Sequence, residues 1–360
     1  MRSLRHMTHN TTSQVVFKKH FLIILTIVIL SWFAIFYIIQ REVLTKPYIL
    51  RLEEHKNDAS CYFLNEEDAL SSAEDDGFSP RPNSIFFHET SCRGGLTSRQ
   101  ACAVESAARA HPRRQVYVLF SAPVNEQVLA RNCLAQLRLF PNVRLARVHI
   151  TDYAKNTPLA EMIAKKPFYE SEWWIQHTSD LLRCLTLYKW GGVCLDTDLI
   201  VTKSLTPLGH NWVAKGSNGL VNTAAIAISM DHLGRKLATT LINEVKTTYR
   251  PDLWLHNGPG AITRVLHKTC NTHNVVEWSS NTCKGLEIYG PEYFNPLQYS
   301  KKSDYFKTGD REARAEKAYI YHFWNTLTQN MTVEKESPYD KMAMTYCPTV
   351  YKMYGDDFGI

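Results

Sequence analysis

From position 84 onwards, short apolar runs alternate with longer segments whose apolar residues recur every three to four positions. The short runs have the length of β-strands, and the longer segments have the period of amphipathic helices. The expected strands are 84–88, 115–120, 143–150, 193–201, 212–215 and 224–229, and the expected helices are 98–110, 125–139, 172–190, 232–248 and 259–268. Thr97, with Gln100 three residues later, matches a capping box for the first helix. This alternation predicts an α/β domain with a mainly parallel sheet and a ligand site beyond the carboxyl ends of its strands.

A different pattern stands near the N-terminus, where residues 21–39 form an uncharged stretch of nineteen residues. Such a stretch is long enough to cross a bilayer as a helix. The residues before it include four basic side chains and no acid, which predicts that the N-terminus is cytosolic. A cleaved signal peptide is the alternative, but the run exceeds a usual signal-peptide core and no small-residue cleavage site follows it. We expect a cytosolic tail at 1–20 and an uncleaved transmembrane anchor at 21–39.

Residues 40–81 are acidic and rich in serine, which predicts a solvated stem ahead of a folded domain at 82–360. The formal net charge is +6, but four of the basic residues precede the anchor. Without these four, 37 basic residues stand against 35 acidic ones. No basic stripe remains that would indicate a nucleic-acid partner.

All nine cysteines lie beyond the expected anchor. In an oxidising lumen this predicts disulfides and at least one odd thiol. Cys270 and Cys283 bracket a short polar loop and are the expected pair. Cys184 and Cys194 lie in apolar periodic segments, which favours buried thiols. No Cys-x-x-Cys spacing occurs, so a structural zinc site is not expected.

Two carboxylates, Asp196 and Asp198, interrupt an apolar run that follows a glycine turn. In an extended segment, residues two apart point to the same side, so both acids can face one site. Hard oxygen donors of this kind suit Mg²⁺ or Mn²⁺ shared with the phosphates of a ligand. A solvated turn between two strands would also explain a bare Asp-x-Asp. Upstream, Asp180 and Arg183 lie three residues apart on the expected helix and so share a face near the same strand end.

Several motifs then occur in one order, and together they resemble the Golgi α1,4-glycosyltransferases. They are Ser-Asp-x-x-Arg at 179–183, Gly-Gly-x-x-Leu-Asp-Thr-Asp at 191–198, Gly-Pro at 258–259 and His-x-Trp-Asn at 322–325. Further matches are Val-Glu-Ser-Ala-Ala-Arg at 104–109, Phe-Pro-Asn-Val at 140–143 and Tyr-Cys-Pro at 346–348. The resemblance covers residues 84–348. It is far more specific than the lone Asp-x-Asp.

The resemblance implies a single lumenal domain of the GT-A type that binds a UDP-sugar through Mn²⁺ or Mg²⁺. It places the UDP-sugar against Asp180, Arg183, Asp196, Asp198, Gly258 and Trp324, the metal on Asp196, Asp198 and His322, and catalytic amides at Asn222 and Asn257. A buried strand ending in tryptophan would explain the tract around His322 almost as well. For Asn222 and Asn257, a turn-forming asparagine is the favoured alternative on side-chain preference alone.

Three positions depart from the family pattern. Thr223 stands where a glycine is usual after Asn222, Asn257 replaces a glutamine, and Cys194 replaces a tyrosine. None of these departures removes an expected metal ligand.

The function implied is that of a single-pass type II enzyme of the Golgi membrane, with its catalytic domain in the lumen. It would transfer galactose or N-acetylgalactosamine to a glycosphingolipid in α1,4 linkage, with retention of configuration. No acid in these motifs is placed as a nucleophile, which favours attack on the same face of the sugar. Two alternatives remain open: transfer of N-acetylglucosamine or mannose to glycoprotein glycans, and a lectin-like protein without turnover. Asn330-Met331-Thr332 is the one lumenal N-glycosylation sequon.

Overall fold

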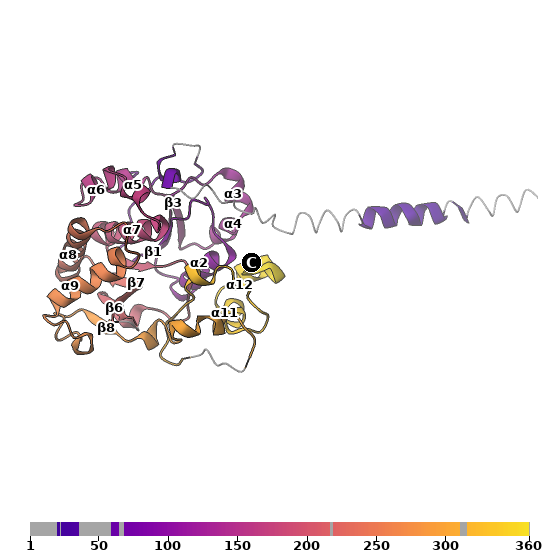
Figure 1. Ribbon diagram of the computed structural model, residues 1–360. Helices are drawn as coiled ribbons and strands as arrows, with labels where there is room; N and C mark the ends of the chain where they lie inside the picture. Colours follow the sequence, from indigo (N-terminus) through magenta and orange to yellow (C-terminus); the bar gives the residue numbers. More distant parts are fainter. Residues whose placement is uncertain are drawn as a thin grey trace, which may run out of the picture. The chain divides into compact units, whose positions relative to one another are not determined.

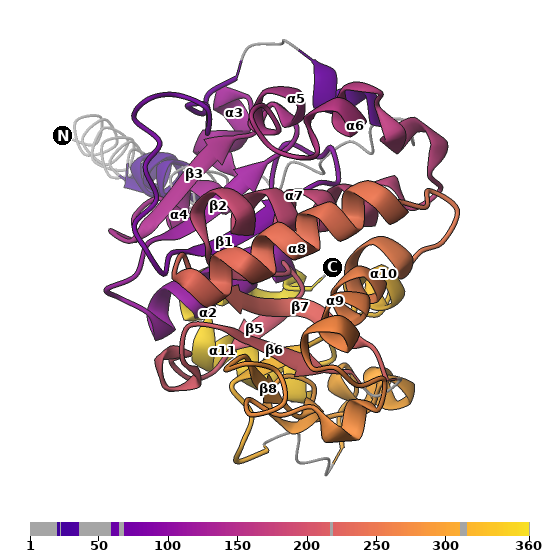
Figure 2. The ribbon, with the colours of Figure 1, turned by 90° about the vertical axis from the view of Figure 1, so that its left-hand side faces the viewer.

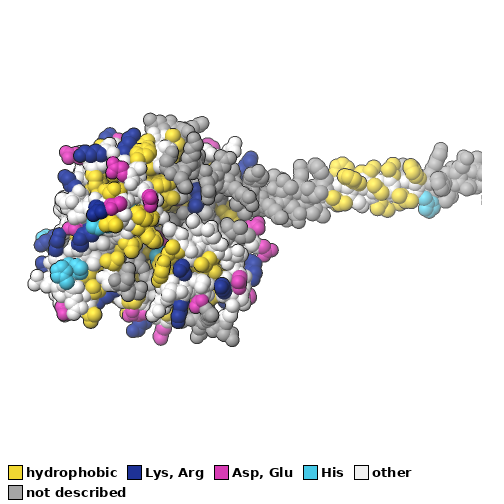
Figure 3. All heavy atoms as spheres, viewed as in Figure 1, with side chains coloured by type: hydrophobic (Ala, Val, Ile, Leu, Met, Phe, Trp, Pro, Cys, Tyr) yellow, Lys and Arg dark blue, Asp and Glu magenta, His cyan; other side chains and the backbone are white. Residues whose placement is uncertain are grey.

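The computed structural model describes residues 20–21, 23–35, 59–64, 68–216, 219–309 and 315–359. The chain divides into two compact units, Met1–Ile49 and Leu50–Ile360. In the first unit, residues 23–35 are helical and carry exposed apolar side chains (Figure 3). Among the described residues, none of the helices has the length and apolar content that a membrane crossing requires. The expected tail 1–20, apart from His20, and positions 22 and 36–39 of the expected anchor lie outside the described residues.

In the second unit, the described residues form a seven-stranded sheet of order β3-β2-β1-β4-β7-β6-β8 (Figure 1). These strands are β1 Ile85–Glu89, β2 Val116–Phe120, β3 Val143–Arg147, β4 Gly192–Leu195, β6 Trp212–Lys215, β7 Val221–Ile228 and β8 Glu287–Tyr289. The pairs β1–β2, β2–β3, β1–β4 and β6–β8 are parallel, and β7 runs antiparallel to both β4 and β6. The predicted α/β class with a mainly parallel sheet is therefore confirmed.

Helices cover both faces of this sheet because its buried strands alternate side chains between two apolar clusters. The helices are α2 Ser98–Ala110, α3 Glu126–Arg131, α4 Leu134–Leu137, α5 Ile150–Tyr153, α6 Ala160–Ala164, α7 Trp174–Trp190, α8 His232–Thr248, α9 Ala261–Thr269, α10 Asn325–Thr328, α11 Pro338–Tyr346 and α12 Pro348–Tyr354. Phe87 and Leu195 pack towards α2, α11 and α12. Phe86 and Cys194 pack towards α7, α8 and α9, and Figure 2 looks onto this face, with α8 in front of the sheet.

Most expected elements occur with shifts of one to three residues, and 98–110, 212–215 and 232–248 match their observed bounds. The Thr97–Gln100 capping box is confirmed by reciprocal hydrogen bonds. The helix expected at 125–139 is broken into α3 and α4, because Asn132 has an extended backbone that ends the first of them. The strand expected at 143–150 ends at Arg147, and the residues from Ile150 onwards begin α5.

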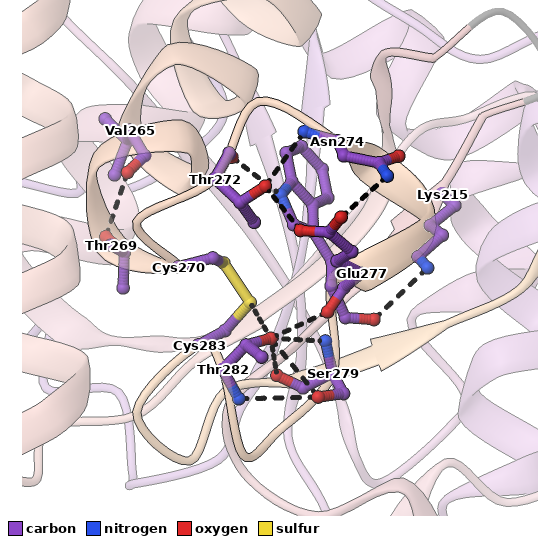
Figure 4. Close-up of a disulfide and its surroundings, with 11 residues drawn as sticks. Lys215, Val265, Thr269, Cys270, Thr272, Asn274, Glu277, Ser279, Thr282 and Cys283 are labelled. Atoms are coloured by element: carbon purple, nitrogen blue, oxygen red, sulfur yellow. Dashed lines mark hydrogen bonds between the residues drawn. A yellow bond between two sulfur atoms is a disulfide. The ribbon is translucent and has the colours of Figure 1, made fainter.

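Three disulfides join Cys61 to Cys92, Cys102 to Cys347, and Cys270 to Cys283. The last confirms the expected pair, whose polar loop is closed further at Thr282, where the hydroxyl accepts from Ser279 N–H and donates to Glu277 O (Figure 4). Cys133, Cys184 and Cys194 are buried free thiols, as expected for the latter two.

Part of the expected stem packs on the domain. Ala59, Cys61 and Tyr62 are buried, and Ser72 forms a parallel bridge with Arg147 at the edge of β3. The packed region therefore begins before the boundary expected at residue 82, because a disulfide and a short stretch of strand-like pairing hold residues that composition alone assigns to a solvated tether.

Candidate active site

Asp196 and Asp198 lie where the chain leaves the central sheet. β4 ends at Leu195, a turn carries both acids, and β5 Leu199–Val201 pairs antiparallel with β9 Ile320–His322. The two acids therefore converge through a turn rather than through one extended strand. This pairing of β5 with β9 brings His322, which is distant in sequence, to the same place.

These three side chains form a candidate metal site. Ligand atoms of Asp196, Asp198 and His322 all lie within 4.8 Å of one another. Asp198 Oδ1 lies 3.1 Å from His322 Nε2, and His322 Nδ1 is buried without a hydrogen-bond partner. Two carboxylates and an imidazole fit a divalent cation such as Mn²⁺ or Mg²⁺, so the donor set agrees with the expected ligands. A cation held there would supply positive charge to a diphosphate.

Arg183 joins the acids of α7 and the β4–β5 turn. Its Nη1 donates to Asp180 Oδ1 at 2.7 Å, and its Nη2 donates to Asp196 Oδ1. A guanidinium can make both bonds because its donors form a planar fork. The structure thus places Arg183 as a clamp between two carboxylates, with Nε alone left without a partner.

Gly258 lies against this clamp. A Cβ added to Gly258 would stand 2.1 Å from Asp180 Oδ1, which is closer than side-chain contacts allow. Gly258 is buried and does not line the cavity, but it lies against Asp180, which does.

Burial and charge act differently on the four ionisable groups. Burial raises the pKa of Asp180 to about 7, against the opposing effect of Arg183. Burial also raises the pKa of Asp196 despite the same arginine. Burial also acts to raise the pKa of Asp198. The charge and hydrogen bond of His322, with the backbone N–H of Asn325, outweigh burial, so the pKa of Asp198 is lowered. Burial disfavours the charged form of His322, yet Asp198 raises its pKa above the usual value. Asp198 is therefore the acid most readily ionised in this cluster.

Trp324 adopts a left-handed backbone conformation, with φ 51° and ψ 58°. This conformation is unfavourable for a residue with a Cβ, and it directs the next amide, Asn325 N–H, onto Asp198 Oδ2 at 2.7 Å. The indole ring lies 5.1 Å from the His322 ring, centroid to centroid. Trp324 thus contributes to the position of both Asp198 and His322.

A cavity of about 870 Å³ lies over this cluster. Asp180, Arg183, Asp196, Asp198, Asn222, His322 and Trp324 all line it. Asn257 does not line it: its Oδ1 accepts from Arg250 N–H at 2.9 Å, and its Nδ2 donates to Arg250 O at 2.7 Å. The structure brings Asn222 to the site and uses Asn257 to hold a turn.

The cavity also has lining residues that the sequence motifs do not include. Glu89 is the last residue of β1, and its Oε1 accepts from Ser91 N–H at 3.0 Å and from the Ser91 hydroxyl, while Oε2 is buried without a partner. Arg93, four residues after Glu89, lines the same wall. An acid at the carboxyl end of an apolar parallel strand was the signal that could have identified Glu89, since the same signal identified Asp196.

The sequence has clear relatives. Residues 97–215 match the glycosyltransferase sugar-binding region containing the DXD motif, and residues 230–354 match the alpha 1,4-glycosyltransferase conserved region. The lactosylceramide 4-alpha-galactosyltransferase of Rattus norvegicus is 33% identical over 278 residues, which cover 75% of this chain and 76% of the relative. A human alpha-1,4-N-acetylglucosaminyltransferase is 23% identical over 276 residues, covering 74% and 79% of the two chains.

Among solved structures, the galactosyltransferase LgtC in complex with donor and acceptor sugar analogues has 15% identity and a TM-score of 0.39, and the match covers 73% of this chain and 95% of that one. This likeness is weak, so the assignment rests on the sequence relatives. Because the chain shares 33% identity with the rat enzyme over three quarters of both proteins and carries the matched sugar-binding region, it belongs to the α1,4-glycosyltransferase family and is a hexosyltransferase.

Proposed function

We propose that the chain is a retaining α1,4-glycosyltransferase of the GT-A type. It transfers galactose, or N-acetylgalactosamine, from a UDP-sugar to the terminal sugar of a glycosphingolipid such as lactosylceramide. The observation that carries this proposal is the cluster of Asp196, Asp198 and His322, clamped by Arg183, on the wall of one large cavity. The name of the rat relative supports the choice of galactose and lactosylceramide.

The chemistry of the transfer fits this cluster. The bond from the anomeric carbon to the UDP diphosphate breaks, and a bond to an acceptor hydroxyl oxygen forms. The hydroxyl proton passes to the departing diphosphate, which leaves as UDP. Asp196, Asp198 and His322 would hold a divalent cation against the diphosphate, where its charge stabilises the leaving group. We propose that acceptor attack occurs on the face from which UDP departs, with Asn222 beside the donor sugar.

The membrane topology forms part of the proposal. Residues 21–39 would anchor the protein in the Golgi membrane, with residues 1–20 in the cytosol and the unit that contains the cavity in the lumen. Three disulfides in this unit support an oxidising compartment. Asn330 is exposed, and it would carry an N-glycan in that location.

One assay tests the proposal. The full-length chain in detergent is incubated with Mn²⁺, lactosylceramide, and UDP-galactose, UDP-N-acetylgalactosamine or UDP-N-acetylglucosamine in turn. We expect transfer from one of the first two donors, and a product cleaved by an α-galactosidase or an α-N-acetylgalactosaminidase. The variant Asp198→Ala should lose at least a hundredfold in rate, the scale on which deleting one transition-state stabilising group acts. Equal activity of this variant, or activity without divalent metal, would contradict the assigned site.

The same panel addresses the second candidate function. The human N-acetylglucosaminyltransferase relative gives this alternative its basis. Preferential use of UDP-N-acetylglucosamine would favour that function over galactosyl transfer. Binding of UDP-sugars without release of UDP would favour a lectin-like protein.

A further inference from the structure

The short segment 59–64 lies ahead of both matched family regions, yet it is built into the domain. Ala59, Cys61 and Tyr62 are 1%, 3% and 2% exposed. The Tyr62 ring packs edge-on against Phe168 and Trp174, with ring centroids 5.7 and 5.5 Å away. Such burial beside the first residue of α7 shows that this segment is a structural part of the domain.

Two bonds connect this segment to the loop that follows β1. Cys61 is bridged to Cys92, and the Tyr62 hydroxyl donates to Thr90 O at 2.6 Å. The loop is also connected to α7, because Thr90 Oγ1 donates to Ile175 O at 3.0 Å. Residues 59–64 and α7 therefore hold residues 90–93 from two sides.

The loop has a backbone that needs such support. Cys92 has φ 63°, a left-handed conformation that residues with a Cβ rarely adopt. Conformations of this kind persist where surrounding contacts enforce them. For Cys92, the covalent bond to Cys61 is a contact that does so.

The same loop supplies polar groups to the cavity. Ser91 fixes one oxygen of Glu89 and leaves Glu89 Oε2 buried and unpaired on the cavity wall. Arg93 lines this wall as well, and its positive charge interacts favourably with Glu89. A free carboxylate oxygen accepts a hydrogen bond from an N–H or O–H group, and a guanidinium binds phosphate oxygens. A nucleoside diphosphate sugar offers both kinds of group.

We propose that Cys92 is a positioning residue of the donor site: its disulfide to Cys61, together with the Tyr62 hydroxyl, fixes the loop 90–93 so that Glu89 and Arg93 contact the bound nucleotide-sugar. This inference rests on the proposed function and adds a part of the expected stem to the substrate site. It predicts that breaking the bridge weakens nucleotide binding more than it lowers kcat. The reason is that a preorganised loop lowers the entropic cost of ordering the loop on binding.

The test is direct binding of UDP in the presence of Mn²⁺, measured by calorimetry on the full-length chain in detergent. For Cys61→Ser with Cys92→Ser, we expect the Kd for UDP and the KM for the UDP-sugar to rise about tenfold, while kcat changes less than about threefold. The matched control is Cys270→Ser with Cys283→Ser, which also removes one disulfide. Neither Cys270 nor Cys283 lines the cavity. The control should lose thermal stability and keep its Kd.

A Kd that is unchanged in the Cys61/Cys92 variant, while the wild type binds UDP, would overturn the positioning role and leave the proposed function intact. Failure of the wild type to bind UDP would overturn both. If the double variant does not fold, Tyr62→Phe decides, because it keeps the buried ring and removes the hydroxyl that donates to Thr90 O. We expect a rise in Kd of about threefold for Tyr62→Phe, and an unchanged value would contradict the inference.

Discussion

At the scale of single residues, Arg183 links two acids of the site that come from different elements. The guanidinium bonds Asp180 and Asp196 at once, so the distance between α7 and the β4–β5 turn is set by one planar group. The backbone of Trp324 has a similar effect on Asp198, since it aims the Asn325 amide at one carboxylate oxygen. Both features hold carboxylates that burial alone would keep protonated.

Arg183→Lys should therefore reduce activity although it conserves charge. A single ammonium cannot bridge two carboxylates in the same geometry, so one buried acid loses its partner. We expect kcat/KM for the UDP-sugar to fall by about 2 kcal/mol in transition-state free energy, a value within the range for a charged hydrogen bond. Steady-state kinetics on a variant with an unchanged circular dichroism spectrum provide the measurement. Wild-type kinetics would show that Arg183 has no role in the site.

Gly258→Ala should also disturb this clamp. The added methyl group would overlap Asp180 Oδ1, so Asp180 must move away from Arg183 or the turn at Gly258 must shift. Overpacking of this kind costs about 1–3 kcal/mol of stability. The midpoint temperature of thermal unfolding and kcat/KM should both decrease. Gly77→Ala is the control, because nothing lies within 4 Å of its added Cβ, and it should behave like the wild type.

Single residues could be predicted where a local pattern marks them, and not where their role depends on tertiary contacts. Asp196 and Asp198 could be recognised because two acids interrupt an apolar run, whereas their approach to His322 depends on the pairing of β5 with β9. Asn257 matched a motif, but its amide is occupied by the backbone of Arg250, which a motif does not reveal. Glu89 belongs to no motif and was not predicted, although its place at the end of β1 could have identified it.

At the scale of elements, the strands and long helices could be predicted because burial imposes their periods. The helix α8, with its regular apolar stripe and the Asp231 cap, matches its expected bounds. The segment 125–139 carries a helical period as well, but Asn132 interrupts it. Whether such a break occurs depends on tertiary contacts, here the bond from Asn132 Nδ2 to Leu96 O.

The loop between Cys270 and Cys283 is an element whose stability can be tested separately from activity. The bridge closes a loop with a sequence separation of 13 residues, and replacing both cysteines by serine should lower the free energy of unfolding by about 3 kcal/mol in the loop-entropy picture. Urea unfolding of this variant and of the wild type gives the difference. Loss below about 1 kcal/mol would show that the hydrogen bonds of Thr282 and Glu277 hold the loop without the bridge.

At the scale of the whole molecule, contacts between distant segments close the domain. Cys102 on α2 is bridged to Cys347 between α11 and α12, a separation of 245 residues. Arg99 donates to Thr328 O and to Gly359 O, at 2.8 Å each. The sequence could not identify the Cys102–Cys347 bridge, because nine cysteines allow many connectivities and nothing in the spacing of these two residues favours their pairing.

His111 provides another such contact and makes stability depend on pH. Its Nδ1 donates to Ala107 O at 2.9 Å and its Nε2 accepts from Leu205 N–H at 2.8 Å, so the neutral ring satisfies both groups. Burial lowers its pKa from 6.5 to about 4. Below pH 6.5 the unfolded chain therefore binds a proton that the folded protein excludes, and stability falls as the pH decreases towards 4.

Between about pH 7.5 and pH 5, this group should lower the free energy of unfolding by about 2 kcal/mol. Asp180 acts in the opposite direction, because its pKa is raised to about 7 and protonation favours the folded state. The contribution of His111 is therefore measured as the difference between the wild type and His111→Asn, in which Asp180 is retained. Urea unfolding at both pH values should show a smaller pH dependence in the variant. Equal pH dependence in the two proteins would mean that His111 carries its proton in the folded state, and that the Leu205 N–H does not bond to its ring.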